Sequence, residues 1–266
     1  KEKNPKTIVI MGGPNFPTKP VERERYLKQY PNIDFYIKWD GEVSYVDLVE
    51  KLIKYKLNVT QFKKDKVISK NCCYLKDEEY IEGPDHRIND LSEMPSAYTM
   101  GLMDKFFGMG LSPAYETTRG CPYSCTFCNS GHNFKSVITR KSTETIRQEL
   151  EYIAKRTEKD TELQITDDNF GMYKEDVEIC RVISDIIKEY NWPPYIHVAR
   201  GKSQPERIIE TSAIINEHQD GTIRFGASLQ SNDTEVLKNI KRKNLPLEKL
   251  ITYTKLRQTD DNTNDF

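Results

Sequence analysis

Long apolar runs, a signal-peptide pattern and an excess of charge of one sign are all missing from this sequence of 266 residues. The longest apolar stretches, residues 7–11 and 213–215, are far shorter than the ~20 residues that a membrane-spanning helix needs. The 40 basic and 41 acidic residues nearly cancel, so overall charge does not favour a nucleic acid or an anionic membrane as partner. We therefore expect a cytoplasmic protein with neither partner.

Cysteine is also scarce. Six cysteines are too few for the disulfide framework of a secreted domain, yet three of them fall within eight residues: Cys121, Cys125 and Cys128. Three thiolates on one loop supply only three of the four positions that a closed zinc site or a fully ligated iron–sulfur cluster uses. The loop therefore predicts a metal centre with one open position, where a chelating ligand can bind.

The first part of the chain reads as an α/β half-domain. An apolar strand over residues 7–11 ends at Gly12 and Gly13, where backbone freedom permits a sharp turn. A helix is predicted over 20–30, a strand over 33–37, a helix over 45–54, and a hairpin within the charged, irregular stretch 59–95. Strand and helix alternate, which predicts parallel strands with right-handed crossovers. We assign residues 1–84 to this domain.

Strand and helix alternate again after a linker, residues 85–112, which prolines at its borders and turn residues mark. Strands are predicted over 113–118, 162–166, 195–199 and 222–229, with helices over 143–155, 174–190, 205–217 and 234–240. Four consecutive βα units predict part of a β/α barrel over residues 113–266, whose ligands lie at the carboxyl ends of the strands. The barrel stops after about four strands.

The cysteine loop carries a family resemblance. The segment ETTRGCPYSCTFC, Glu116 to Cys128, holds CxxxCxxC after the first barrel strand, with Phe127 before the last cysteine. It resembles the radical S-adenosylmethionine (SAM) enzymes. The resemblance implies that the three cysteines hold a [4Fe-4S] cluster, that the amine and carboxylate of SAM chelate its open iron, and that Phe127 lies against the adenine.

Further implications of the resemblance concern the reaction and its partners. Reductive cleavage of SAM yields a 5′-deoxyadenosyl radical, which abstracts hydrogen from a substrate at the barrel mouth. We expect that substrate to be a small molecule or a peptide. An electron donor such as flavodoxin or ferredoxin is implied as well.

Polar residues follow the predicted strands at their carboxyl ends. The stretch DDNFG, residues 167–171, stands where the family usually has a GGE-like motif that contacts the amine of SAM, and it resembles the subgroup with an upstream cobalamin domain. The resemblance adds SAM contacts at Asp168, Asn169, Arg200, Ser228 and Gln230. A helix cap at DDNFG, or a salt bridge of Arg200 at the barrel rim, is the alternative.

The glycine pair extends the resemblance upstream. Gly12 and Gly13 come after a strand about a hundred residues before the cysteine loop, as in the later half of a cobalamin-binding Rossmann-like domain. The expected architecture is α/β: a partial cobalamin-binding domain followed by a partial β/α radical SAM barrel. Cobalamin is then a third cofactor, and the enzyme a methyltransferase or a catalyst of radical rearrangement or oxidation.

Two alternatives stay open. The upstream domain could be a vestigial scaffold without cobalamin. The chain could also be a non-catalytic, metal-stabilised binding module, with Cys72, Cys73 or His132 closing a zinc site. A barrel that stops after four strands leaves an unpaired edge, so we expect this chain alone to be aggregation-prone and the natural protein to extend at both ends.

Overall fold

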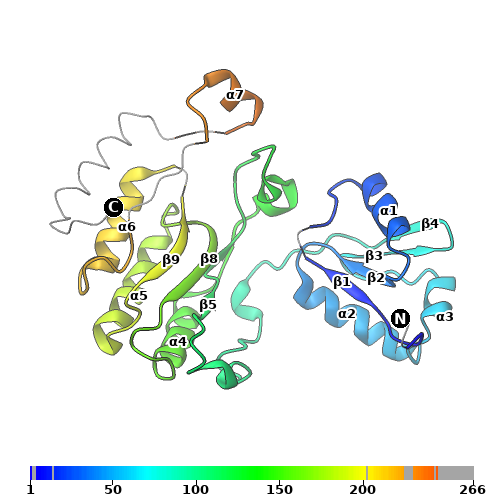
Figure 1. The fold of residues 1–266 in the computed structure, drawn as a ribbon, viewed down its shortest axis with the longest axis horizontal. Coiled ribbons are helices and arrows are strands. Elements are labelled where there is room, and N and C mark those ends of the chain that lie inside the picture. The colour runs from blue at the N-terminus through cyan, green and yellow to red at the C-terminus, as the bar shows by residue number, and fades with distance from the viewer. Residues whose placement is uncertain (2–3, 14, 202, 225–229, 243, 245–266) are drawn as a thin grey trace. The chain divides into compact units, whose positions relative to one another are not determined.

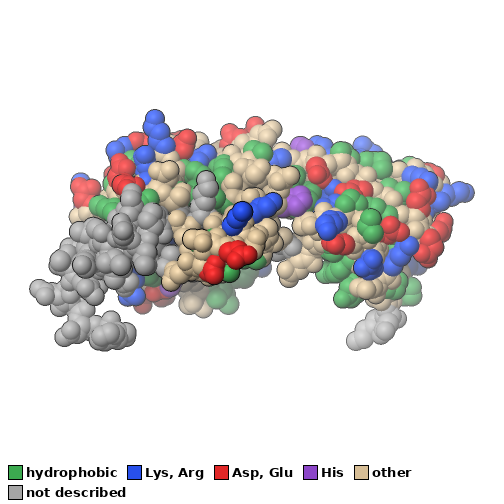
Figure 2. Space-filling model, turned by 90° about the horizontal axis from the view of Figure 1, so that it is seen from above, with side chains coloured by type: hydrophobic (Ala, Val, Ile, Leu, Met, Phe, Trp, Pro, Cys, Tyr) green, Lys and Arg blue, Asp and Glu red, His purple; other side chains and the backbone are tan. Residues whose placement is uncertain are grey.

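The chain forms two compact units, residues 1–88 and residues 89–266. A computed structural model describes residues 1, 4–13, 15–201, 203–224, 230–242 and 244 (Figure 1). Among these residues, no helix has both the length and the apolar character to span a membrane. Acidic and basic side chains are interspersed on the face drawn in Figure 2, as the near-zero net charge predicts.

The first unit is a four-stranded sheet with three helices. Its strands, in the order in which they pair, are β1 (Ile10–Gly12), β2 (Phe35–Ile37), β3 (Cys72–Lys76) and β4 (Glu79–Glu82). The pair β1–β2 is parallel, as predicted, and β3–β4 is the predicted antiparallel hairpin. The helices are α1 (Pro20–Gln29), α2 (Gly41–Lys54) and α3 (Val59–Lys64).

Several elements of this unit differ from the prediction. Strand β1 begins three residues after the predicted start and includes Gly12, and β2 begins two residues after its predicted start. Helix α2 begins four residues before the predicted start. Helix α3 lies in a stretch that the sequence predicts to be irregular. Its signal is local: the Asn58 side chain accepts a hydrogen bond from the Gln61 backbone at 3.0 Å, and Phe62 is buried in the core.

The second unit is built on three parallel strands, β5 (Ala114–Tyr115), β8 (Leu163–Phe170) and β9 (Ile196–Arg200), paired in that order. Within its described residues, the α-helices are α4 (Thr143–Ala154), α5 (Asp176–Tyr190), α6 (Pro205–Asn216) and α7 (Thr234–Asn239) (Figure 1). Short 3-10 helices lie at Leu91–Glu93, Asp104–Phe106, Asn129–Gly131 and Asn133–Ser136. Apolar residues of α4, α5 and β8, among them Ile146, Ile165 and Ile183, form the core.

The α/β fold class is thus confirmed. Three of the four predicted strands of the barrel are present. Of the fourth, predicted over 222–229, residues 225–229 lie outside the described part, and Thr222, Ile223 and Arg224 form no strand. The carbonyl of Thr222 still accepts a hydrogen bond from the Ile196 backbone at 2.8 Å, so the chain continues beside β9.

A two-stranded ribbon that the sequence did not predict encloses the cysteine loop. Strand β6 (Thr118–Arg119) pairs antiparallel with β7 (Thr139–Arg140). Two-residue strands give no periodicity from which they could be predicted. The ribbon brings the two ends of the segment 120–138 together, so the cysteines lie on a closed loop.

Candidate functional site

A glycine fixes the entry to the cysteine loop. Gly120 has a φ of +115°, and a Cβ there would lie 2.5 Å from the Val137 carbonyl oxygen and 2.8 Å from that of Lys135. The next residue, Cys121, donates its backbone N–H to the Lys135 carbonyl at 2.8 Å. The two halves of the loop therefore cross closely, and only glycine fits at the crossing.

The three cysteines lie on a compact turn. Cys121 and Cys125 are 2% and 4% exposed, and Cys128 is partly exposed. The Cys128 backbone donates to the Cys125 carbonyl at 3.1 Å, and Gly131 approaches so closely that a Cβ there would lie 2.3 Å from the same oxygen.

The donor chemistry of this turn suits an iron–sulfur cluster, because soft thiolates favour iron–sulfur, zinc or copper(I) centres. In the described part of the chain, no three His, Cys, Asp or Glu side chains meet closely enough to hold a single metal ion. A cubane cluster does not need such a meeting point, because each cysteine ligates a different iron. Each of the three cysteines can therefore serve as the ligand of one iron.

The residues considered as a fourth zinc ligand have other surroundings. Cys72 and Cys73 lie in β3, buried in the first unit. Burial raises the pKa of the Cys73 thiol to about 12 and that of Cys72 well above its usual value, so both stay protonated. The His132 Nδ1 accepts a hydrogen bond from the Phe134 backbone at 3.2 Å. The open position of the metal centre stays a prediction.

Strand β8 carries two predicted site residues to the cysteine loop. The sequence places Asp168 and Asn169 after the strand, but β8 runs through both. The Asn169 Nδ2 donates to the Cys121 Sγ at 3.2 Å, and the Asp168 carboxylate accepts a hydrogen bond from the Ser130 hydroxyl at 3.1 Å. Both side chains therefore contact the loop, one at its first cysteine and one just beyond its last.

Asp167 opens the DDNFG stretch, but it is not among the predicted SAM contacts. Its carboxylate is buried and accepts hydrogen bonds from the Thr117 backbone at 2.8 Å and from the Thr117 hydroxyl at 2.5 Å. Burial raises its pKa to about 7. The contact joins β8 to the bend between β5 and β6, just before the cysteine loop, so Asp167 helps to fix where the loop starts.

Arg200, at the end of β9, turns toward helix α6. Its Nη2 donates to the Ile208 carbonyl at 2.9 Å and to the Ser212 hydroxyl at 2.5 Å. Burial lowers its pKa to about 10. Its Nε and Nη1 are buried and find no hydrogen-bond partner within the described residues. The predicted contact of Arg200 with SAM stays a prediction.

A polar cluster connects the loop to the ends of two strands. The Tyr123 hydroxyl contacts the Ser203 hydroxyl and donates to the Met172 Sδ at 3.1 Å. Met172 and Ser203 follow β8 and β9, respectively. No pattern in the sequence indicates this contact, which holds the loop against the carboxyl ends of the sheet.

The remaining predicted SAM contacts are less defined. Phe127 is 51% exposed, which leaves its ring available for stacking. Gln230 is exposed and lies outside any helix or strand. Ser228 lies outside the described residues.

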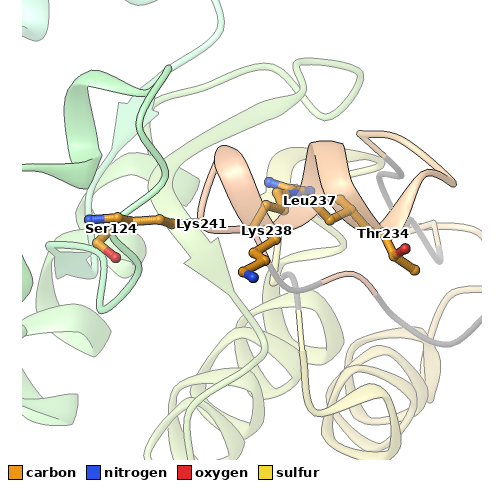
Figure 3. Close-up of a pocket in the computed structure, with 6 residues that line it drawn as sticks. Ser124, Thr234, Leu237, Lys238 and Lys241 are labelled. Carbon is orange, nitrogen blue, oxygen red and sulfur yellow. The ribbon is translucent and has the colours of Figure 1, made fainter.

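A basic cavity of about 540 Å³ lies between the cysteine loop and α7 (Figure 3). The Thr126 backbone donates to the Ile240 carbonyl at 3.1 Å and joins the two segments. Figure 3 shows the Lys241 side chain extending toward Ser124. The lining contains three cations and no carboxylate, so it suits an anionic group: Ser124, Thr234, Leu237, Lys238, Lys241 and Arg242.

The glycine pair of the first unit forms a turn at the carboxyl end of β1. A Cβ at Gly12 would lie 3.3 Å from the Ile37 carbonyl oxygen, and Gly13 has a φ of +105° with no atom near its Cβ position. The Tyr36 hydroxyl donates to the Gly13 carbonyl at 3.2 Å. The turn requires glycine at 13 for its backbone angle and leaves that side open to a ligand.

Comparison with known families decides the family of this chain. Residues 115–259, more than half of the sequence, match the Radical SAM superfamily. The chain belongs to the radical SAM superfamily. The match contains the cysteine loop, β8 and β9, so the cofactors typical of the superfamily, a [4Fe-4S] cluster and SAM, apply to this site.

Two relatives extend the similarity over 97% of this radical SAM chain, each at 30% identity. One is the cobalamin-dependent radical SAM methyltransferase TokK of Streptomyces tokunonensis. The other is the 2-(S-pantetheinyl)-carbapenam-3-carboxylate methyltransferase of Streptantibioticus cattleyicolor. The chain spans 37% of the length of each. Their similarity places it in the subgroup that includes cobalamin-dependent enzymes.

Solved structures show the same fold. OxsB, a cobalamin-dependent SAM radical enzyme solved with aqua-cobalamin and SAM bound, superposes with a TM-score of 0.63 at 18% identity. That match covers 92% of this radical SAM chain and 34% of OxsB. TsrM, a radical SAM methyltransferase from Kitasatospora setae, gives a TM-score of 0.62 at 14% identity over 95% of this chain and 48% of its own.

Proposed function

We propose that the protein containing this chain is a cobalamin-dependent radical SAM methyltransferase. The observation that carries the proposal is the closed CxxxCxxC loop, in which Cys121, Cys125 and Cys128 would ligate the [4Fe-4S] cluster. When bound, the cluster and SAM supply a 5′-deoxyadenosyl radical by reductive cleavage, and cobalamin supplies a methyl group. Methyl transfer is favoured over rearrangement or oxidation because two relatives that match 97% of the chain are methyltransferases.

The residues around the loop would bind and orient SAM. The exposed Phe127 ring offers a face for the adenine. The Asp168 carboxylate, bonded to Ser130 at the edge of the loop, would accept the ammonium group. Gln230 and Ser228, at the predicted end of the fourth strand, would contact the ribose or the carboxylate.

Arg200 would have to turn from α6 to reach the SAM carboxylate. Its Nε and Nη1, which have no hydrogen-bond partner among the described residues, would donate hydrogen bonds to that carboxylate. The energetic reason is that a buried N–H without an acceptor is costly, and a carboxylate would satisfy it.

The domain assignment belongs to this proposal. Residues 1–84 would be the later part of the cobalamin-binding domain, 85–112 the linker and 113–266 the radical SAM barrel. Gly12 and Gly13 would let the backbone approach cobalamin, because neither presents a side chain and the Gly13 side of the turn is open.

The reductant would be an acidic one-electron carrier such as flavodoxin or ferredoxin. The cavity beside Ser124 supports this, because Lys238, Lys241 and Arg242 place positive charge next to the loop that receives the electron. The methyl acceptor would be a small molecule or a peptide.

The test is an anaerobic reconstitution of the full-length protein with iron, sulfide and cobalamin. We expect bound cobalamin, together with formation of 5′-deoxyadenosine from SAM, and loss of the latter in Cys121→Ala. Bound zinc in place of iron, with no 5′-deoxyadenosine, would contradict the proposal. Formation of 5′-deoxyadenosine without cobalamin binding would indicate the vestigial upstream domain.

A further inference from the structure

The amide of Asn169 faces a cysteine sulfur inside the protein. Its Nδ2 lies 3.2 Å from the Cys121 Sγ, and the residue is 1% exposed. We propose that Asn169 is a positioning residue that raises the reduction potential of the cluster by donating a hydrogen bond to the Cys121 thiolate. This inference rests on the cluster of the proposed function.

The regular alternation of β8 places this side chain on the buried face of the strand. The buried positions of that alternation are Leu163, Ile165, Asp167 and Asn169, and the side chains between them are exposed or partly exposed. The alternation breaks only at Phe170, where the pairing with β9 has shifted register. The amide thus lies against the first cysteine, 48 residues earlier in the chain.

The direction of the hydrogen bond follows from the chemistry of the ligand. A thiolate bound to iron carries no proton, so only the N–H end of the amide can face it favourably. The Oδ1 at the other end is buried and has no hydrogen-bond partner among the described residues. The amide is therefore held in place by its nitrogen, while its oxygen is still able to accept.

The effect on potential follows from charge. When the oxidised [4Fe-4S]2+ cluster takes one electron from its donor it becomes [4Fe-4S]+, no bond breaks, and negative charge on the cysteine sulfurs rises. An N–H dipole aimed at one sulfur stabilises the more negative state, and the effect is larger in a buried site. Asn169 therefore favours the reduced cluster.

Two variants with side chains of nearly the same size as asparagine separate the loss of the hydrogen-bond donor from the effect of an added negative charge. Asn169→Leu removes the donor, and Asn169→Asp replaces it with a carboxylate. We expect the equilibrium constant for reduction to fall about tenfold in Asn169→Leu, a tenfold change being ~59 mV for one electron, and to fall further in Asn169→Asp. Thr166→Val is the control, because its hydroxyl, on the same strand, contacts the Tyr115 carbonyl and no cysteine.

The experiment is an anaerobic redox titration of the reconstituted full-length protein, followed by electron paramagnetic resonance, with iron content measured in parallel. A lower potential with wild-type iron supports the proposal. An unchanged potential with wild-type iron overturns it and leaves the proposed function standing. Failure of the wild-type protein to assemble a cluster overturns both the role of Asn169 and the proposed function.

A second measurement needs no variant to fold. Protein labelled with 15N at asparagine side chains is reduced and studied by pulsed electron paramagnetic resonance. We expect a 15N coupling to the reduced cluster in the wild-type protein. Its absence in the wild-type protein overturns the proposal even if Asn169→Leu loses its iron.

Discussion

Replacing Gly120 with alanine tests whether the loop crossing positions the first cysteine. A φ of +115° is strained for alanine, at about 1–3 kcal/mol. The new Cβ would also lie 2.5 Å and 2.8 Å from two carbonyl oxygens, and such overpacking costs about 1–3 kcal/mol more. The sum, about 2–6 kcal/mol, is a large part of the about 5–15 kcal/mol that stabilises a typical protein.

The loop can relieve this strain only by moving Cys121 or by breaking its hydrogen bond to Lys135. We therefore expect Gly120→Ala to lower the free energy of unfolding and to lose most of its iron after anaerobic reconstitution. Gly110→Ala is the matched control, because Gly110 also has a positive φ, +70°, but its Cβ position is empty. Equal iron content and equal stability in the two variants would refute the reasoning.

Three further predictions concern neighbouring side chains. Burial raises the pKa of Asp167 from 3.8 to about 7, so between these values the folded state holds a proton that the unfolded state has lost. As the pH rises from about 4 to 7, the free energy of unfolding of the wild-type protein should therefore fall relative to that of Asp167→Asn, by at most about 1.4 kcal/mol per pH unit. Urea unfolding measures this difference, and a difference that does not depend on pH would contradict the prediction. Asp168→Ala should weaken SAM binding about tenfold or more with iron content unchanged, whereas iron loss at unchanged affinity would make Asp168 structural. The double variant Lys238→Glu, Lys241→Glu should slow reduction of the cluster by flavodoxin about tenfold at low salt and leave reduction by dithionite unchanged. Equal rates of reduction by flavodoxin in the wild-type protein and the variant would show that these lysines do not attract the electron donor.

The sequence predicts the elements that depend on local pattern. Apolar periodicity indicates α4, α5 and α6, and the spacing of Cys121, Cys125 and Cys128 indicates the metal loop. Short or irregular elements are missed, because the strands that enclose the loop have two residues each and α3 depends on one cap and one buried Phe62.

Contacts across the fold could not be predicted in the same way. The sequence brings Asp168 and Asn169 to the correct end of the sheet, but places them in a turn after the strand. Their actual partners, Ser130 and Cys121, lie 38 and 48 residues earlier in the chain, so no local pattern encodes these contacts. The bond of Asp167 to Thr117 likewise needs two segments 50 residues apart.

Three cysteines that hold a cubane cluster leave its remaining iron open to SAM. Mössbauer spectroscopy of the full-length protein, reconstituted anaerobically with 57Fe, tests this arrangement when spectra with and without SAM are compared. We expect a [4Fe-4S] spectrum in which the signal of a single iron site changes on addition of SAM. A protein that takes up no iron, or a cluster whose spectrum SAM leaves unchanged, would contradict it.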